Sequence, residues 1–141
     1  MSMQITFPGG MAVDAGYRGH TIHTDQPQAA GGEGSGPTPF DLFLVSIGTC
    51  AGYYALRFCR ERGLDTAGLA LSLETEWDAG REHLAAVRIE IELPPAFPVK
   101  YRAAVVRAAE QCKVKRLIQA PPRFVVAAVE SRGAPLVPAA I

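Results

Sequence analysis

The chain has 141 residues, with 14 basic and 14 acidic side chains, so its formal net charge is zero and its length suits one domain with a single core. This balance excludes the basic surface typical of nucleic-acid binders, and no apolar run reaches the roughly 18 residues of a membrane span. We therefore expect one domain over residues 1–141 that binds neither nucleic acid nor membrane. The N-terminus lacks the charged and apolar regions of a signal peptide, which indicates a cytoplasmic protein.

The first third of the chain alternates apolar and polar residues between two glycine turns, at residues 8–10 and 17–19. This pattern predicts a small antiparallel meander. Residues 26–37 (QPQAAGGEGSGP) then lose all apolar periodicity, which predicts a mobile loop.

A long helix is predicted to begin at Thr38, with Pro39 at its first position and Asp41 three residues after the cap, and to end at Gly63. Its apolar residues surround the axis, so we expect it to be mostly buried. Gly48 and other small residues surround Cys50, and each glycine inside a helix costs about 1 kcal/mol relative to alanine. Something must therefore approach the helix backbone there, either a packed sheet or symmetry mate, or a ligand.

The second half of the chain combines a hairpin with short helices. Alternating apolar residues over 69–77 and 87–93 predict the hairpin, and Pro98 starts a helix over 99–111. Residues 114–118 form another short turn, and Phe124 opens a last apolar strand that ends at Val129. The predicted order is βββ-α-ββ-α-(α)-β, an α+β fold in which antiparallel sheet covers one long central helix.

Two of the three cysteines, Cys50 and Cys112, lie on predicted helices beside small or polar residues, where a thiol can be approached. The odd cysteine count argues for reduced thiols, so any disulfide here would be transient. A thiol that attacks a peroxide needs a lowered pKa, and its sulfenic acid can condense with a second thiol to a disulfide that an external dithiol reduces. Cys112 fits the resolving role, and inert packing is the alternative for both residues.

Cys50 lies about three turns into its helix, too far for the helix N-terminus to lower its pKa. An activating cation must come from elsewhere, and the sequence does not choose among the candidates. They are Arg18 in the second turn and the cluster Lys113, Lys115 and Arg116 after Cys112.

The remaining polar residues offer weaker sites. Cys59 is nine residues beyond Cys50 and points to the opposite side of the helix, so we expect it to be inert core. His20 and His23 are three apart on a predicted strand and face opposite sides, so they do not chelate a metal together. The glycine-rich residues 32–36 lack the Lys-Ser/Thr of a phosphate loop. We expect no metal and no cofactor.

The segment GGEGSGPTPFDLFLVSIGTC, from Gly31 to Cys50, resembles the loop, helix start and first reactive cysteine of the OsmC/Ohr superfamily (osmotically inducible protein C and organic hydroperoxide resistance). The sequence around Cys112 resembles its second reactive cysteine, and the element order agrees over nearly the whole chain. The resemblance implies a swapped homodimer with two interface sites, each using Cys50 and Cys112 to reduce organic hydroperoxides at the expense of an external dithiol.

Three positions depart from the peroxidase pattern of this superfamily. Phe40 stands where the hydroperoxide resistance enzymes have a glutamate, and Asp41 follows one position later, as a cap partner or a weak candidate for thiol activation. The stretch at residues 7–11 lacks the arginine that this glutamate orients, and Lys113 replaces a proline found in many members. The alternative is therefore a non-catalytic protein of the same fold that binds a small hydrophobic ligand or senses redox state. Acyl transfer through Cys50 is disfavoured because no histidine is an obvious base.

Overall fold

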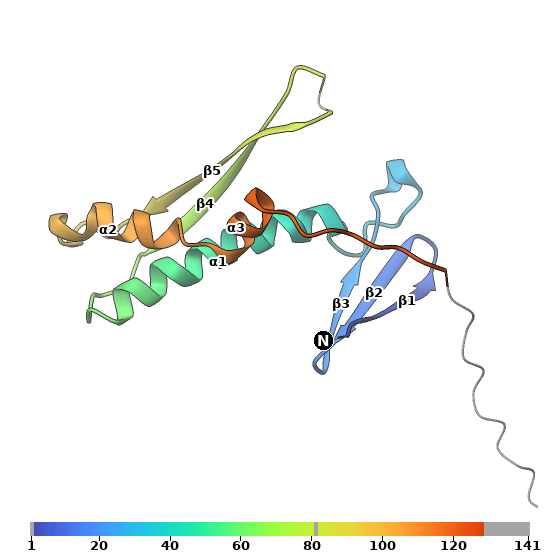
Figure 1. Cartoon of the computed structure of the whole chain (residues 1–141), viewed down its shortest axis with the longest axis horizontal. Helices are drawn as coiled ribbons and strands as arrows, with labels where there is room; N and C mark the ends of the chain where they lie inside the picture. Colours follow the sequence, from blue (N-terminus) through green and yellow to red (C-terminus); the bar gives the residue numbers. More distant parts are fainter. Residues whose placement is uncertain (1, 81, 129–141) are drawn as a thin grey trace, which may run out of the picture.

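The computed structural model describes residues 2–80 and 82–128, which contain two antiparallel sheets and three α-helices (Figure 1). The elements in chain order are β1 (Gln4–Gly9), β2 (Ala12–Tyr17), β3 (His20–Thr24), the 3-10 helix η1 (Gln28–Ala30), α1 (Pro39–Arg60), β4 (Ala70–Trp77), β5 (Leu84–Glu92), α2 (Val99–Ala109) and α3 (Lys113–Gln119). The predicted α+β class is confirmed.

The N-terminal meander is a three-stranded sheet in the order β1-β2-β3. Its two tight turns contain residues with positive φ, Gly10 at 56° in the first and Gly19 at 79° in the second. A left-handed backbone of this kind is open to glycine at no steric cost, which explains why the glycines mark the strand ends. The sheet lies at one end of α1 (Figure 1).

Helix α1 is the long axis of the molecule and begins with a complete capping box. The Thr38 hydroxyl accepts the backbone N–H of Asp41 at 3.1 Å, and the Asp41 carboxylate accepts the backbone N–H of Thr38 at 2.8 Å. The predicted start is therefore confirmed, and Asp41 is the cap partner. At the other end Gly63 adopts φ 62° and turns the chain away from the helix axis.

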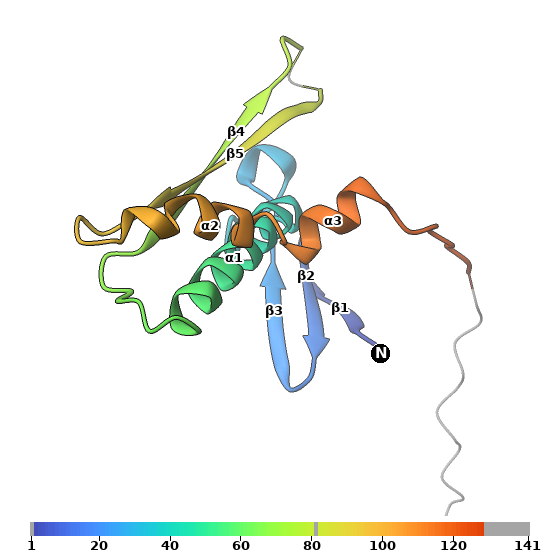
Figure 2. The same cartoon turned by 60° about the vertical axis from the view of Figure 1, so that its left-hand side comes forward.

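The β4–β5 hairpin packs on the glycines of α1 near its base, and its turn projects away from the helices in both views (Figure 2). A Cβ added to Gly48 would lie 3.6 Å from the Leu73 Cδ1, and one added to Gly52 would lie 3.9 Å from the Leu71 Cδ1. These are ordinary van der Waals distances, so a methyl group would fit at both positions. Leucines of β4 pack on this part of α1, but, contrary to the expectation from the sequence, the approach is not close enough to require glycine.

The core lies between α1 and α2, which run side by side (Figure 2). Its buried residues are Ala51, Ala55, Phe58, Cys59, Phe97, Val105, Ala109 and Cys112. By length and composition α1 could cross a membrane, but core helices of soluble proteins pass the same test. Here α1 packs against α2, α3 and β4 of its own chain. Only five of its 22 residues are buried, and Phe43, Val45 and Tyr53 are exposed, so the expectation that α1 is mostly buried is wrong within this chain.

The final strand predicted for Phe124 to Val129 is not formed in the described part of the chain. Residues 121–128 have no regular secondary structure, and Val129 lies outside the described residues. A strand requires a neighbouring strand edge for its backbone hydrogen bonds, and both described sheets are built from β1 to β5 only. The side chains of Phe124 and Val126 are consequently exposed.

Candidate thiol site

Cys50 and Cys112 come together where α1 meets the start of α3. Cys50 is half-buried in the middle of α1, whereas Cys112 follows α2 and is the N-cap residue of α3. The Cys112 sulfur accepts the backbone N–H of Lys115 at 3.4 Å, so it takes the place of the oxygen that usually caps a helix. The predicted turn over residues 114–118 is in fact the helix α3, and this helix brings the second thiol to the first.

The two thiols influence each other's ionisation, and their surroundings move their pKa values in opposite directions. The Cys112 S–H itself donates to the Ile47 carbonyl at 3.8 Å. Burial opposes ionisation of Cys50, but its pKa is lowered overall by the backbone N–H of Val114, the Cys112 thiol, and the backbone N–H and charge of Lys113. Burial raises the pKa of Cys112, which is only 1% exposed, and the neighbouring Cys50 raises it further. Cys50 is therefore the more acidic thiol of the pair and Cys112 the less acidic one.

Of the predicted activating groups, the structure brings Lys113 to Cys50. The Arg18 guanidinium lies over the Tyr17 ring, 5.3 Å from its centroid, at the β2–β3 turn. Asp41 is engaged in the capping box at the helix start, nine residues before Cys50. Cys59 is fully buried in the core, and burial raises the pKa of its thiol, as expected for an inert residue.

The sequence did not predict that the backbone N–H groups of Lys113 and Val114 stabilise the Cys50 thiolate. These amides belong to the first turn of α3, whose N–H groups have no partner within the helix. A prediction that a helix begins directly after Cys112 could have revealed these two amides. The half-buried thiolate is thus held by main-chain dipoles more than by a side-chain cation.

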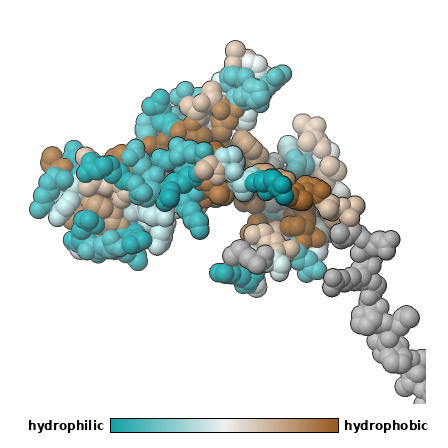
Figure 3. All heavy atoms as spheres, viewed as in Figure 1, coloured by the Kyte–Doolittle hydropathy of each residue, from teal (hydrophilic) through white to brown (hydrophobic). Residues whose placement is uncertain are grey.

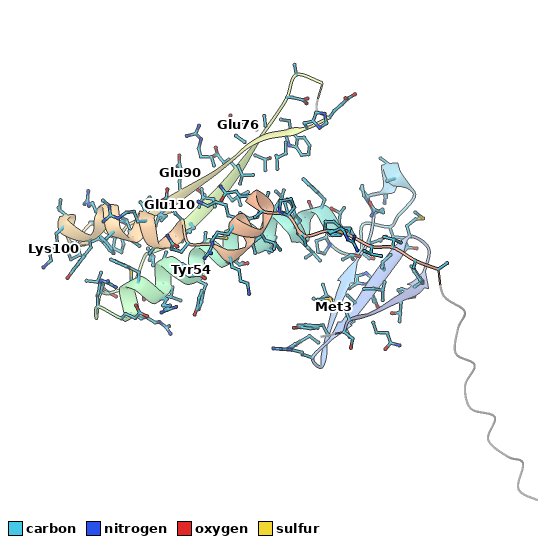
Figure 4. The ribbon with its side chains drawn as sticks, in the orientation of Figure 1. Met3, Tyr54, Glu76, Glu90, Lys100 and Glu110 are labelled. Carbon is cyan, nitrogen blue, oxygen red and sulfur yellow. The ribbon has the colours of Figure 1, made fainter. Side chains whose placement is uncertain are left out.

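A cavity of about 320 Å³ opens beside Cys112, between α1, β5 and α2. Figure 3 shows apolar surface where the hairpin meets the helices, and Figure 4 shows Glu110 at the end of α2, on the side of the hairpin. The cavity is lined by Ile47, Ala51, Val87, Ile89, Ile91, Val106, Ala109, Glu110, Cys112 and Lys115. Its apolar walls with two charged groups suit a small hydrophobic molecule that carries one polar end.

The described residues contain no group of three or more His, Cys, Asp or Glu side chains that could hold a metal ion. The two thiols of the site can undergo oxidation of Cys50, condensation with Cys112, and thiol–disulfide exchange.

Comparison with known proteins places the same region in a known family. Residues 32–127 match the family model described as OsmC-like protein. No curated protein sequence matches the chain.

Two solved structures share the fold. One is an osmotic stress induced and detoxification response protein of Psychrobacter arcticus 273-4, with a TM-score of 0.70 and 22% identity over 82% of this chain and 86% of that chain. The other is an organic hydroperoxide resistance protein OsmC from Legionella pneumophila, also described as a redox protein and regulator of sulfide bond formation. Its TM-score is 0.53, with 16% identity over 84% of this chain and 90% of that one.

Proposed function

Because the chain belongs to the OsmC-like protein family, we propose that it is a thiol-dependent peroxidase that reduces organic hydroperoxides in the cytoplasm as part of oxidative-stress defence. One observation supports this most strongly, namely two neighbouring thiols whose pKa values are shifted in opposite directions. A more acidic thiol beside a less acidic one suits peroxide reduction, in which the first attacks and the second resolves. The Legionella protein of the same fold is described as an organic hydroperoxide resistance protein.

In the proposed reaction the Cys50 thiolate attacks the distal oxygen of the hydroperoxide. The O–O bond breaks, the alkoxide takes a proton and leaves as the alcohol, and Cys50 becomes a sulfenic acid. The Cys112 sulfur then attacks the Cys50 sulfur, water leaves, and a Cys50–Cys112 disulfide forms. An external dithiol restores both thiols by exchange and is itself oxidised to a disulfide.

The apolar cavity, which is lined by Cys112 and not by Cys50, supports an organic substrate rather than hydrogen peroxide. Its volume of about 320 Å³ is at the lower end of the range for ligand pockets, and its walls are mostly aliphatic. Burial of an alkyl or aryl group there would contribute about 25 cal/mol for each Å² of apolar surface removed from water.

The first test is the intact mass of the reduced protein after one equivalent of cumene hydroperoxide, before and after a dithiol is added. We expect the loss of two hydrogens, reversed by the dithiol and mapped to Cys50 and Cys112. Cys112→Ser should instead gain one oxygen on Cys50. An unchanged mass in the wild-type protein would overturn the proposed activity.

A second candidate function is the non-catalytic binding of a small hydrophobic ligand or redox sensing, which the same cavity favours together with Phe40 in place of the glutamate of the peroxidases. Under this function, hydrophobic ligands would raise the melting temperature while the hydroperoxide left the mass unchanged. The two functions are therefore separated by one pair of measurements on the same sample.

We also propose that two copies of the chain form a homodimer, as the family resemblance implies. All six residues of β1 are exposed, including Phe7, and Met3 lies just before this strand at the edge of the sheet (Figure 4). A small sheet needs a covered apolar face to be stable in water. A second copy could cover this face and pair with the unpaired segment that begins at Phe124.

Sedimentation of the wild-type protein should give twice the mass of one chain. Phe7→Glu should shift the equilibrium towards monomer, whereas Gln4→Glu on the same strand adds the same charge without removing an apolar group and should not. A monomeric wild-type protein at micromolar concentration would contradict the dimer and leave the thiol chemistry untouched.

A further inference from the structure

The loop over residues 26–37 has a defined backbone path, built around the side chain of Asp25. This carboxylate is 2% exposed and accepts the backbone N–H groups of Gln26, Glu33 and Ser35 at 2.7, 3.1 and 3.0 Å. It also accepts the Ser35 hydroxyl at 2.8 Å. These bonds, led by the Ser35 amide, hold the pKa of Asp25 far below its usual range, so the group is always an acceptor near neutral pH.

His23 joins this loop to the N-terminal sheet. Its Nδ1 lies 2.6 Å from the Asp14 Oδ1, across the β2–β3 pair in which the two residues face each other, and its Nε2 lies 3.0 Å from the Ser35 Oγ. A Cβ on Gly36 would lie 2.8 Å from the His23 Cδ2. Only a glycine at position 36 lets the loop backbone come this close to the imidazole ring.

One protonation state of His23 satisfies all the hydrogen bonds of this arrangement. The Ser35 hydroxyl has one proton, and it donates this proton to Asp25, which is ionised. Its oxygen must then accept at His23, so Nε2 carries a proton. The Asp14 carboxylate accepts from Nδ1, so that nitrogen carries a proton too. A ring that donates from both nitrogens is an imidazolium.

We propose that protonated His23 holds loop 26–37 on the β2–β3 hairpin, and that loss of its proton loosens the loop. We call this contact the clasp. When the ring loses its proton, Nε2 becomes an acceptor, and the Ser35 hydroxyl can satisfy either His23 or Asp25 but not both. The loop then has one hydrogen bond fewer. It also loses the attraction between the ring cation and the acidic groups that face it, which are Asp14 on β2 and, from the loop, Asp25 and Glu33.

The clasp acts at the joint between the two halves of the molecule. The two ends of the loop lie side by side, because the Asp25 N–H donates to the Pro37 carbonyl at 3.3 Å. Thr38 follows directly as the cap of α1. Tightening the loop on the sheet therefore fixes how the N-terminal sheet is attached to the helix that carries Cys50.

The same three residues do not form a nucleophilic serine site, although Asp14, His23 and Ser35 have the order of a catalytic triad. An alkoxide on Ser35 would lie 2.8 Å from the ionised Asp25, and like charges at that distance oppose its formation. The arrangement suits a neutral hydroxyl that connects a cation to an anion.

Hydrogen exchange of the 26–37 peptide between pH 6 and pH 8.5, corrected for the intrinsic pH dependence of exchange, tests the clasp. Wild-type protection should fall as the pH rises, by roughly 2- to 12-fold, the range for one hydrogen bond. The hydrogen bond is present while His23 is protonated and is lost when the ring loses its proton. Protection should therefore fall, and not rise, as the pH increases. His23→Gln should make the protection independent of pH.

His20→Gln is the matched control, because His20 is exposed at the opposite end of β3 and should leave the wild-type dependence intact. Ser35→Ala keeps the histidine but removes its partner, and it should reduce the pH dependence to the part that comes from the attraction between the ring and the acidic groups. It serves as the test if His23→Gln does not fold. Nitrogen NMR of the wild-type ring should show both nitrogens protonated under the conditions in which the loop is protected. Protection that does not change with pH in the wild type, or an unchanged dependence in Ser35→Ala, would overturn the proposal.

Discussion

The two halves of the molecule are packed very differently. Helices α1 and α2 with the base of the β4–β5 hairpin enclose a core in which Ala55, Cys59 and Val105 are completely buried. The N-terminal sheet buries only Thr24 below one-tenth exposure, and Phe7 on β1 is 79% exposed. One half is stabilised within its own chain, while the other has strands whose apolar groups still require a cover. The thiol pair lies in the half that is already packed.

The largest effect is expected at the thiols of the packed half. Cys50→Ser should reduce the rate of hydroperoxide consumption roughly 10³-fold or more, the scale on which loss of a nucleophile acts. The rate is followed by the disappearance of cumene hydroperoxide in the presence of a dithiol. Cys59→Ala, which removes the buried and inert thiol, should retain the activity, and equal losses in both variants would contradict the assignment.

The next effect concerns the contrast in burial itself. Val105 is fully buried on α2, and its neighbour Val106 is 47% exposed on the same helix. Val105→Ala removes buried methyl groups and leaves a cavity, so the free energy of unfolding should fall by about 2 kcal/mol. Val106→Ala should change it by less than about 0.5 kcal/mol. Urea denaturation at one fixed protein concentration measures both, and similar losses would show that the packed half has no distinct core.

A smaller effect is expected where the two halves meet, at the capping box of α1. Thr38→Ala removes the hydroxyl that accepts the Asp41 N–H and should lower the free energy of unfolding by about 1 kcal/mol. Thr49→Ala is the control, because the Thr49 hydroxyl donates to the Val45 and Ser46 carbonyls of its own helix and caps no helix end. Thermal melts of the two variants should show a lower melting temperature for Thr38→Ala than for Thr49→Ala.

The smallest effect is a shift in the pH dependence of Cys50. Only the thiolate reacts, so its alkylation rate rises with pH through the pKa of Cys50 and levels off above it. Lys113→Gln removes a cation that lowers this pKa, so the profile should move to higher pH, and only slightly because Lys113 is exposed. Peptide-resolved alkylation with iodoacetamide measures the shift. Lys100→Gln, near the start of α2, should leave the profile in place.

Local signals in the sequence were sufficient for most of the elements. Thr38, Pro39 and Asp41 predicted the start of α1 because a helix cap depends on residues within one turn. Alternation predicted the N-terminal meander and the β4–β5 hairpin, because it too is a local pattern. The strand expected from Phe124 is not formed in the described residues, because a strand depends on a neighbour that the described part of the chain does not supply.

The activation of Cys50 could not be predicted from side-chain types. The sequence indicated a cation, either Arg18 or one of the basic residues after Cys112, whereas the larger contributions come from main-chain amides of α3. Backbone dipoles carry no residue signature, and their direction is known only after the helix is placed. In the same way, the composition of residues 26–37 predicted mobility, which stays a prediction, and gave no sign of the Asp25 network that sets the loop's path.

The Cys112 sulfur has two roles, because the atom that would react with Cys50 also accepts the Lys115 N–H at the N-terminus of α3. Bonding of that sulfur to Cys50 would reorient its lone pairs. Each redox cycle would therefore also change the hydrogen bond that caps α3. Serine is then the informative replacement for Cys112, because its oxygen keeps the cap while it removes the thiol. Alanine would remove both, and a loss of activity in Cys112→Ala could not be divided between chemistry and the order of α3.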